Sequence, residues 1–510
     1  MNKKLKLGMI GGGQGAFIGA VHRLCARMDN KYEFVAGCLS STPEKAAKSA
    51  EEIGLDPSRS YPDFKTMAEK ESLREDGIDV VSIVTPNHMH AAPAIEFLNK
   101  NIHVICDKPM TSTMEDAHKL SEAVTKSKAH FFLTHNYSGY PVVREMRSLI
   151  KNGELGKIRI VKGSYLQGWL GSKEEETGEN KQAEWRTDPK RSGVAGAVGD
   201  IGSHTMHLIE FITNEKLQSV AADLSTFVKG RKLDDDASIL IRMTNNVKGN
   251  LSISQIATGE ENNFRISVYG DKGALHWKQE NPNYASYSKV GEPSQIITRG
   301  GPVMHEGSLS NARIPPGHPE GYLEAFAQIY SDVADVIQNK ENKDELLKIL
   351  PGVDEGLHIM KFIQAAVDSS NNKTITYSHT DFQNSGIIYV DSGALPGPSD
   401  SYSFTQFQQE NIESTIFYSE AKTAEPAING NEALHTAAIY TSAYIGDVVV
   451  QATLDNVVNE STHWGDVATV TFTGSESEPV PVNFNGVFNH LRFKTTASPT
   501  DKISKILVRN

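Results

Sequence analysis

The chain has 510 residues, enough for three domains, and its formal net charge of −12 argues against nucleic acid or an anionic membrane as the main partner. Its three cysteines, Cys25, Cys38 and Cys106, suggest no disulfide framework, so we expect a reducing compartment. It contains no run of about eighteen apolar residues that would predict a membrane span. Glycines interrupt the stretch after the basic start, which argues against a signal peptide, so the expected location is the cytoplasm.

The first 137 residues alternate between short apolar runs and helical stretches. The runs are LKLGMI (5–10), FVAGCL (34–39), VVSIVTP (80–86), HVICDKP (103–109) and HFFLTHN (130–136). Strands and helices at this spacing are typical of βαβ units. Residues 1–137 are therefore predicted to form a doubly wound parallel sheet of the Rossmann type, within an α/β chain.

The segment 138–377 has a different character. Strands are predicted at 157–169, 219–228, 237–244, 248–257, 263–270 and 274–280, and helices at 194–213, 322–338 and 356–370. Several of these strands alternate apolar and polar residues, as a sheet with one solvated face does. We expect an α+β domain with a large open-faced sheet, and such a face favours a homo-oligomer, either a dimer or a tetramer.

The composition changes again after residue 377. Residues 378–510 contain 15 acidic and 6 basic residues, which gives −9 of the total −12. The stretch ALPGPSDS (394–401) is rich in proline, glycine and serine, so 378–400 is predicted to be a linker. Residues 401–510 show strand patterns between polar turns and predict an all-β, sandwich-like accessory module.

A glycine-rich turn follows the first predicted strand and precedes a helix. Gly11, Gly13 and Ala16 fit the pattern G-x-G-x-x-A, with Gln14 and Gly15 between them. Glycines let the backbone approach a pyrophosphate, which the helix N-terminus then stabilises. A plain glycine turn would not explain the strand before it and the helix after it, so we predict a nicotinamide dinucleotide site.

The end of the second strand bears on the choice between NAD and NADP. An acidic residue there would hold the ribose 2′-hydroxyl of NAD. This chain instead has Ser40 and Ser41, with Lys45 shortly after. Hydroxyls and a cation suit a 2′-phosphate, so NADP is slightly favoured; in the alternative, Lys45 is a solvated helix residue.

Three residues carry the predicted chemistry. Lys108 follows an apolar strand, where it could stabilise a developing alkoxide. Asp200 and His204 stand four apart in an apolar run, hence on one face of a helix, with His204 as proton acceptor and Asp200 as its orienting partner. The alternative for His204 is a structural histidine with a satisfied partner. No metal site is expected.

Further residues are candidates for the pocket on position and chemistry alone. Thr85, Asn87 and His90 follow the third strand, and Asp107 and Lys108 follow the fourth; all are expected at the cofactor cleft. An aromatic wall and donors suited to a sugar or polyol are predicted from Tyr137, Tyr165, Gln167, Trp185, Arg186 and His318.

Taken together, GGGQGA, TPNHMH, CDKPM and GDIGSH resemble the motifs of the Gfo/Idh/MocA oxidoreductases, over residues 4–377. The resemblance implies a Rossmann domain joined to an α/β substrate domain, and NAD(P)-dependent oxidation or reduction of sugars and cyclic polyols. Lys108 matches the lysine of the family's E-K-P motif, and Asp200 and His204 match its Asp and His. Asp107 stands where the family usually has Glu, which leaves the acid's contact near the cofactor ribose open.

The C-terminal module lies outside that resemblance. Its segments TAAIYTSAYIGDVVVQATLD, FNHLRFKTT and ISKILVRN are similar to β-sandwich domains of phage virion proteins, a similarity that carries no catalytic residues. Two alternatives to a dehydrogenase therefore stay open from the sequence. One is a binding or structural protein with an inert oxidoreductase region, and the other is a redox-assisted, NAD-dependent glycosidase.

Overall fold

The computed structural model describes residues 3–372 and, beyond them, 402–404, 407–409, 417–419, 421–423, 434–455, 458–459, 461–476, 478–485, 488–499 and 502–509. The predicted linker 378–400 lies outside these residues. The chain divides between Val390 and Asp391 into two compact units, each described here by itself.

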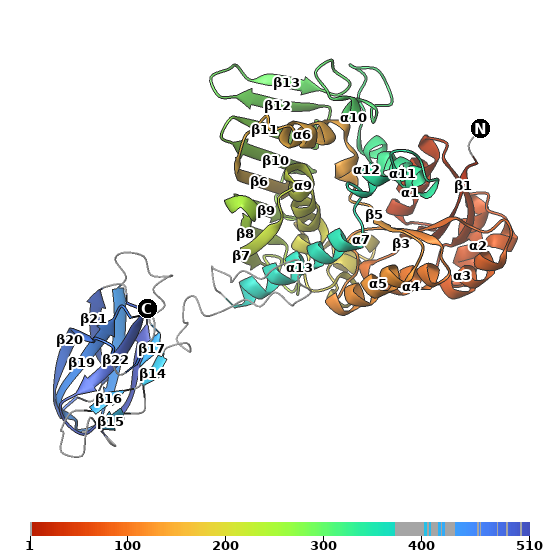
Figure 1. Cartoon of the computed structure of the whole chain (residues 1–510). Helices are drawn as coiled ribbons and strands as arrows, with labels where there is room; N and C mark the ends of the chain where they lie inside the picture. The colour runs from red at the N-terminus through yellow and green to blue at the C-terminus, as the bar shows by residue number, and fades with distance from the viewer. Residues whose placement is uncertain are drawn as a thin grey trace. The chain divides into compact units, whose positions relative to one another are not determined.

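The larger unit begins with a parallel five-stranded sheet in the order β2-β1-β3-β4-β5 (Figure 1). Its strands are β1 (Leu5–Gly11), β2 (Tyr32–Cys38), β3 (Val80–Val84), β4 (His103–Cys106) and β5 (Phe131–Leu133). Every residue of β3 is buried, as expected for a central strand covered on both faces. This confirms the predicted doubly wound parallel sheet, and all three cysteines are free and buried in this part of the chain.

The helices between these strands begin and end with the expected local signals. They are α1 (Phe17–Met28), α2 (Pro43–Glu52), α3 (Phe64–Leu73), α4 (Ala91–Asn99) and α5 (Met114–Lys126). The side chains of Asp63 and Thr113 accept hydrogen bonds from backbone N–H groups in the first turns of α3 and α5. Ala16 gives α1 no such cap, which leaves its first N–H groups free for another acceptor.

The second sheet of this unit has eight strands in the order β13-β12-β11-β10-β6-β9-β8-β7. The strands are β6 (Ile158–Leu166), β7 (Leu217–Ser225), β8 (Asp236–Met243), β9 (Lys248–Ser254), β10 (Asn263–Gly270), β11 (Gly273–Lys278), β12 (Tyr284–Lys289) and β13 (Gln295–Thr298). Alternate residues of β8 are buried and exposed, so one face is solvated as predicted. The sequence prediction missed β12 and β13, which are short edge strands of mixed polarity.

Helices cover the other face of this sheet and the space between the two sheets. Figure 1 shows α6 and α9 against the large sheet. The helices after β5 are α6 (Pro141–Lys151), α7 (Lys181–Arg186), α8 (Pro189–Ser192), α9 (Ser203–Thr213), α10 (Glu306–Leu309), α11 (Tyr322–Ile337), α12 (Lys343–Leu347) and α13 (Val353–Asn371). None of the described helices is long and apolar enough to cross a membrane.

Helix α11 returns to the first sheet, although the predicted boundary at residue 137 places it in the second domain. Its Phe326 and Tyr330 pack with Leu5 and Leu7 of β1 in one buried cluster. The Tyr330 hydroxyl bonds to the ring of His22 at 2.7 Å. The first domain is therefore completed by residues about 300 positions later in the chain.

The smaller unit is an all-β module. Its described strands form a four-stranded sheet, β14-β23-β18-β21, and a six-stranded sheet containing β15-β16-β22-β19-β20 and β17. Apolar side chains from both sheets share one buried cluster, as in a sandwich. The strands are β14 (Tyr402–Phe404), β15 (Phe407–Gln409), β16 (Phe417–Ser419), β17 (Lys422–Thr423), β18 (Leu434–Thr441), β19 (Ile445–Thr453), β20 (Gly465–Thr473), β21 (Val480–Asn485), β22 (His490–Thr495) and β23 (Ile503–Arg509).

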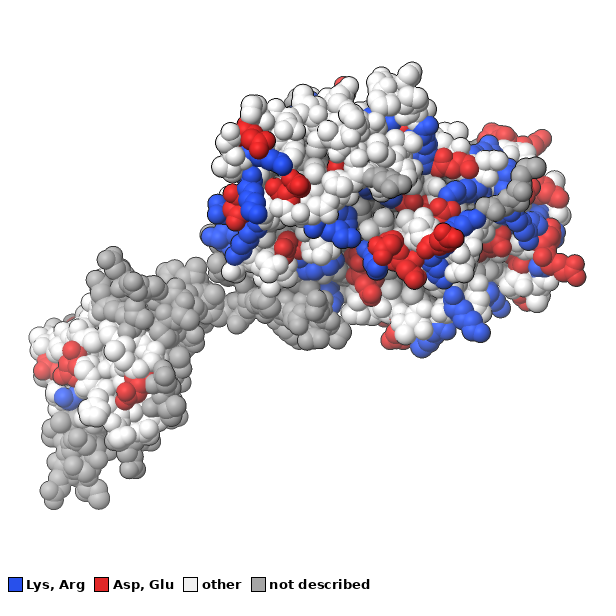
Figure 2. All heavy atoms as spheres, turned by 45° about the horizontal axis from the view of Figure 1, so that its top comes forward, with Lys and Arg blue, Asp and Glu red and all other residues white. Residues whose placement is uncertain are grey.

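Charged side chains are distributed without a dominant basic patch on the visible face of the larger unit. Figure 2 shows lysine and arginine interspersed with aspartate and glutamate there. A nucleic-acid footprint would instead appear as a continuous basic stripe. The face shown carries no such stripe.

Candidate active site

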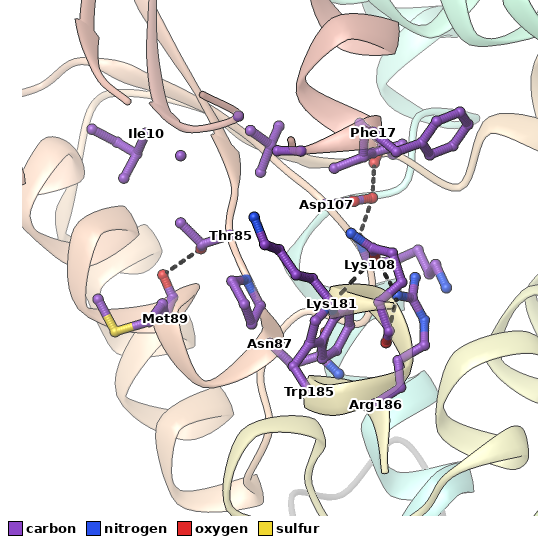
Figure 3. A pocket seen from close by; sticks show the side chains of 18 of the residues that line it. Ile10, Phe17, Thr85, Asn87, Met89, Asp107, Lys108, Lys181, Trp185 and Arg186 are labelled. Carbon is purple, nitrogen blue, oxygen red and sulfur yellow. Dashed lines mark hydrogen bonds between the residues drawn. The ribbon is translucent and has the colours of Figure 1, made fainter. Parts of the chain in front are cut away.

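A cavity of about 1160 Å³ lies inside the larger unit, where residues of the first sheet and of the second domain meet. Figure 3 shows Ile10 and Phe17 on one side of it, with Lys181, Trp185 and Arg186 on the opposite side. The predicted site residues that line it are Gly11, Gly13, Gln14, Gly15, Ala16, Ser40, Ser41, Lys45, Thr85, Asn87, Asp107, Lys108, Tyr137, Tyr165, Gln167, Trp185, Arg186, Asp200 and His204.

The glycine-rich turn joins β1 to α1 at one wall of this cavity. Gly12 has φ +73°, and a Cβ there would lie 2.9 Å from the Cα of Gly19. A Cβ on Gly13 would lie 2.5 Å from the carbonyl oxygen of Leu39. Only glycine fits these positions, and the free N–H groups of α1 face an open cavity, so the turn fits a dinucleotide pyrophosphate.

The end of β2 forms the neighbouring wall. Ser40, Ser41 and Lys45 line it, and Lys45 is only partly buried. At this place a Rossmann domain meets the ribose of its dinucleotide. The side chains present are two hydroxyls and one ammonium, which could bond either a ribose hydroxyl or a 2′-phosphate.

Asp107 and Lys108 follow β4 at the same edge of the sheet. Asp107 Oδ1 accepts hydrogen bonds from the Lys108 backbone N–H at 2.9 Å and from the Thr134 hydroxyl at 2.8 Å. Asp107 therefore braces the turn that carries Lys108. Asp107 also lines the cavity.

Lys108 meets Asp200 at the centre of the cavity. The Lys108 ammonium donates to the side-chain Oδ1 and to the backbone carbonyl of Asp200, both at 2.7 Å. Asp200 Oδ2 accepts from Arg186 Nε and from Gln255 Nε2, both at 2.9 Å. Both oxygens of the buried Asp200 carboxylate are thus hydrogen-bonded, and its negative charge lies between the positive charges of Lys108 and Arg186.

The predicted pairing of Asp200 with His204 takes another form. Residues Val198–Gly202 form a π-helical turn before α9, which changes the angle between residues four apart. The carboxylate turns toward Lys108 and Arg186, while Nδ1 of His204 is buried without a hydrogen-bond partner among the described residues. Asp200, predicted as the orienting partner of His204, therefore acts on the His204 ring through its charge.

These contacts set the protonation states of the cluster. Burial alone would raise the pKa of Asp200, but the Arg186 and Lys108 cations hold it well below its usual range. Burial and the Lys108 ammonium hold the pKa of His204 well below its usual range, against a smaller opposite effect of Asp200. At neutral pH Asp200 is charged and His204 is neutral, so His204 is able to accept a proton.

Asp234, in the loop before β8, anchors the start of the segment that carries Asp200 and His204. Its carboxylate accepts from the backbone N–H of Gly196 at 2.6 Å and of Val198 at 2.8 Å. A Cβ at Gly196 would collide with the Asp234 carbonyl oxygen, so the close approach requires glycine. Burial raises the pKa of Asp234 to about 6, against the effect of those N–H donors.

A chain of uncharged polar groups lines the part of the cavity next to His204. The hydroxyls of Tyr137 and Tyr165 lie 2.6 Å apart. Asn262 Oδ1 accepts from the Tyr165 hydroxyl and from Gln167 Nε2, both at 2.8 Å. Hydroxyl and amide groups that are already oriented by one another suit the recognition of a polyhydroxylated ligand.

Helix α7 supplies an aromatic and cationic wall. The Arg186 guanidinium carbon lies 4.3 Å from the centroid of the Trp185 ring and 6.0 Å from that of Trp169. This stacking orients the Arg186 side chain that holds Asp200. Figure 3 shows Trp185 and Arg186 side by side in the cavity.

Two predicted residues lie outside the cavity lining. His90 is fully buried, and its ring nitrogens lie 2.9 Å and 2.8 Å from the carbonyl oxygens of Pro109 and Thr85, so the ring is held within the first domain. His318 lies in the loop before α11, where its carbonyl accepts from Arg299. His90 thus packs beside the turn that carries Lys108, and His318 lies outside the pocket lining.

Several lining residues were not found from the sequence. Asn262 and Gln279 come from turns at the ends of strands, and Lys181 comes from the first turn of α7. Gln255 does not line the cavity but holds Asp200. None of them belongs to a spaced motif, and only the pairing of β6, β9 and β10 brings Gln255 and Asn262 to this place.

Comparisons with known proteins agree with this geometry. Residues 5–135 match a model described as an oxidoreductase family with an NAD-binding Rossmann fold, and residues 143–276 match the GFO/IDH/MocA C-terminal domain. An oxidoreductase from Sinorhizobium meliloti is 48% identical with a TM-score of 0.66, covering 72% of this chain and 98% of that one.

Two further relatives carry ligand or substrate names. An inositol dehydrogenase homolog complexed with NAD⁺ from Azotobacter vinelandii is 31% identical with a TM-score of 0.71, covering 74% of this chain and 98% of that one. The levoglucosan dehydrogenase of Pseudarthrobacter phenanthrenivorans is 27% identical, covering 62% of this chain and 82% of its own. Nearly the whole length of the two structures is matched, and this chain extends beyond them.

Proposed function

The chain belongs to the Gfo/Idh/MocA family of NAD-binding oxidoreductases, and on that premise we propose that it oxidises or reduces a CH–OH group of a sugar or cyclic polyol. The single observation that carries this proposal is the convergence of Lys108, Asp200 and His204 in the cavity that also contains the glycine-rich turn. A bound nicotinamide dinucleotide supplies the hydride acceptor or donor for this chemistry.

The protein side of the reaction follows from the protonation states. During oxidation His204, neutral because it is buried beside a cation, takes the proton of the substrate hydroxyl, and it returns that proton during reduction. The Lys108 ammonium stabilises the negative charge that develops on the substrate oxygen. Asp200, held by Arg186 and Gln255, fixes the position of the Lys108 ammonium.

The substrate class rests on the cavity and on the relatives. The Tyr137–Tyr165–Asn262–Gln167 chain offers hydroxyl and amide partners, and Trp185 offers an aromatic face. The relatives include proteins named for inositol and for levoglucosan. Both compounds are ring-shaped and carry several hydroxyls, which fits this lining.

The test of the function is a binding and turnover experiment on the full chain. Purified protein is titrated with NADH and NADPH, and then assayed with myo-inositol, levoglucosan and a panel of sugars by absorbance at the nicotinamide band. Binding of a dinucleotide followed by turnover of a polyol is expected. Release of a sugar from an aryl glycoside without net dinucleotide reduction would favour the glycosidase alternative. The same assay on residues 1–377 tests the proposal that the β module is accessory to the chemistry.

Cofactor preference is a separate proposal. Ser40, Ser41 and Lys45 favour NADP, because an ammonium pairs with a 2′-phosphate better than with a ribose hydroxyl. Lys45→Ala is therefore expected to weaken NADPH binding by about five-fold and to leave NADH binding unchanged. Kd values from fluorescence titration check this, with exposed Lys48→Ala on the same helix as control. Equal Kd changes for both dinucleotides would contradict it.

We also propose a homo-oligomer formed through the open face of the large sheet. Leu240 on β8 is 51% exposed and Ile296 on β13 is 69% exposed, and Ile160 on β6 is exposed on the same side. These exposed apolar side chains share one face of the sheet, and burying such a face against a second copy would remove them from water. Light scattering on the full chain should give the mass of a dimer or tetramer, and a monomer at micromolar concentration would contradict the proposal.

A further inference from the structure

We propose that Lys181, supplied by the second domain, is a pyrophosphate-binding residue of the dinucleotide site and that helix α7 links this contact to the catalytic carboxylate. The inference rests on the proposed function, because it assigns a residue to the dinucleotide of that site. The glycine-rich turn predicts nothing about Lys181, which lies about 165 positions further along the chain.

The position of the ammonium is the first observation. A Cβ built on Gly15 would lie 3.2 Å from Lys181 Nζ, so the ammonium is in contact distance of the turn that opens α1. Lys181 and Gly15 both line the cavity. Figure 3 shows the Lys181 side chain extending into the cavity from the side of Trp185, toward the side of Ile10 and Phe17.

Charge is the second observation. The first turn of α1 contains no acidic residue and has no side-chain cap, so its N–H groups and helix dipole leave a positive potential there. Lys108 and Arg186 are paired with Asp200, whereas Lys181 has no hydrogen bond or ion pair with a carboxylate among the described residues. Lys45 and Arg191 also line the cavity without an ion pair in the part of the chain that the structure describes, so it is the contact with Gly15 that singles out Lys181. The Lys181 ammonium and the start of α1 together suit a dianion such as a pyrophosphate.

The position of Lys181 indicates that it would contact the pyrophosphate and not the 2′-phosphate of NADP. Ser40, Ser41 and Lys45 lie at the end of β2, where the ribose and any 2′-phosphate belong. Lys181 lies at Gly15, two residues before the first residue of α1. The pyrophosphate is common to NAD and NADP, so loss of Lys181 should weaken both equally.

Helix α7 connects Lys181 to the residues around Asp200. Lys181 is its first residue and Arg186 its last, which separates their Cα atoms by about 7.5 Å along the axis. Arg186 Nε donates to Asp200 Oδ2 at 2.9 Å, and the guanidinium stacks on Trp185. A contact between Lys181 and the pyrophosphate would therefore connect the dinucleotide site to the helix that positions both Asp200 and the aromatic wall.

The test compares three variants in the full chain. Lys181→Met should raise Kd about ten-fold for NADH, NADPH and ADP-ribose alike, and Lys181→Arg should restore Kd to within about three-fold of wild type. Lys190 is exposed on the neighbouring helix α8 and does not line the cavity, so Lys190→Met should have the Kd values of wild type. The rise of Kd with added NaCl should also be shallower for Lys181→Met than for wild type.

Each outcome has one meaning. Unchanged Kd values for Lys181→Met, with wild-type binding intact, overturn this inference and leave the proposed function standing. Weaker binding of NADPH alone overturns it as well, because the contact would then be to the 2′-phosphate. A wild-type chain that binds none of the three probes overturns the proposed function itself.

Discussion

Lys108→Ala is expected to lower kcat for polyol oxidation by about a thousand-fold, while Kd for NADH changes by less than about three-fold. The Lys108 ammonium lines the cavity and contacts Asp200, which also contacts Arg186. Without it the charge that develops on the substrate oxygen is unopposed. The dinucleotide is held elsewhere, by the glycine-rich turn, so its affinity is retained.

A matched control separates this effect from general loss of charge. Lys119, on helix α5, is 57% exposed and pairs with Glu115, so Lys119→Ala should keep wild-type kcat. Steady-state assays and fluorescence titration are performed on both variants. Near-normal turnover of Lys108→Ala in a folded protein would remove Lys108 from the mechanism.

His204→Asn is expected to lower kcat by about a hundred- to ten-thousand-fold, because it removes the proton acceptor. The pH profile tests the same assignment. The pKa of His204 is held well below 6.5 by burial and by Lys108, so the neutral form persists as pH falls through 6.5. In the wild type kcat/KM for oxidation should stay level from pH 8 down to below 6.5, and should fall only in more acidic solution.

The control here is His118, a helix residue outside the cavity lining. His118→Asn should leave both kcat and the pH profile unchanged. A wild-type profile with a midpoint near 6.5 would mean that the base is solvated like a free imidazole, and this would contradict the buried position of His204.

The parts of the site that the sequence predicts are those with a local signal. The turn at Gly11–Ala16 follows an apolar strand, and Lys108 follows another, so the strand pattern alone places both at the carboxyl edge of a parallel sheet. The spacing of Asp200 and His204 predicted their roles, and the resemblance to the family implied the same roles. These predictions concern residues whose neighbours in the chain determine where they lie.

The parts that the sequence does not predict depend on contacts between distant segments. Gln255 reaches Asp200 only because β9 pairs in parallel with β6, and no periodicity indicates that pairing. The π-helical turn likewise redirects Asp200 from His204 to Lys108, although the spacing of four residues predicted one helix face. His90 resembled a cleft residue by position, but its ring is buried and lies against the backbone carbonyls of Pro109 and Thr85.

The return of α11 to the first sheet has a consequence for how the protein is made. The ring of Phe326 and the ring of Tyr330 fill the cluster around Leu5 and Leu7, and the Tyr330 hydroxyl and carbonyl bond to His22 and Tyr32. While the ribosome is still translating the second domain, the nascent Rossmann half has an uncovered apolar face. That half reaches its final packing only after α11 has emerged, so synthesis order and folding order differ in this chain.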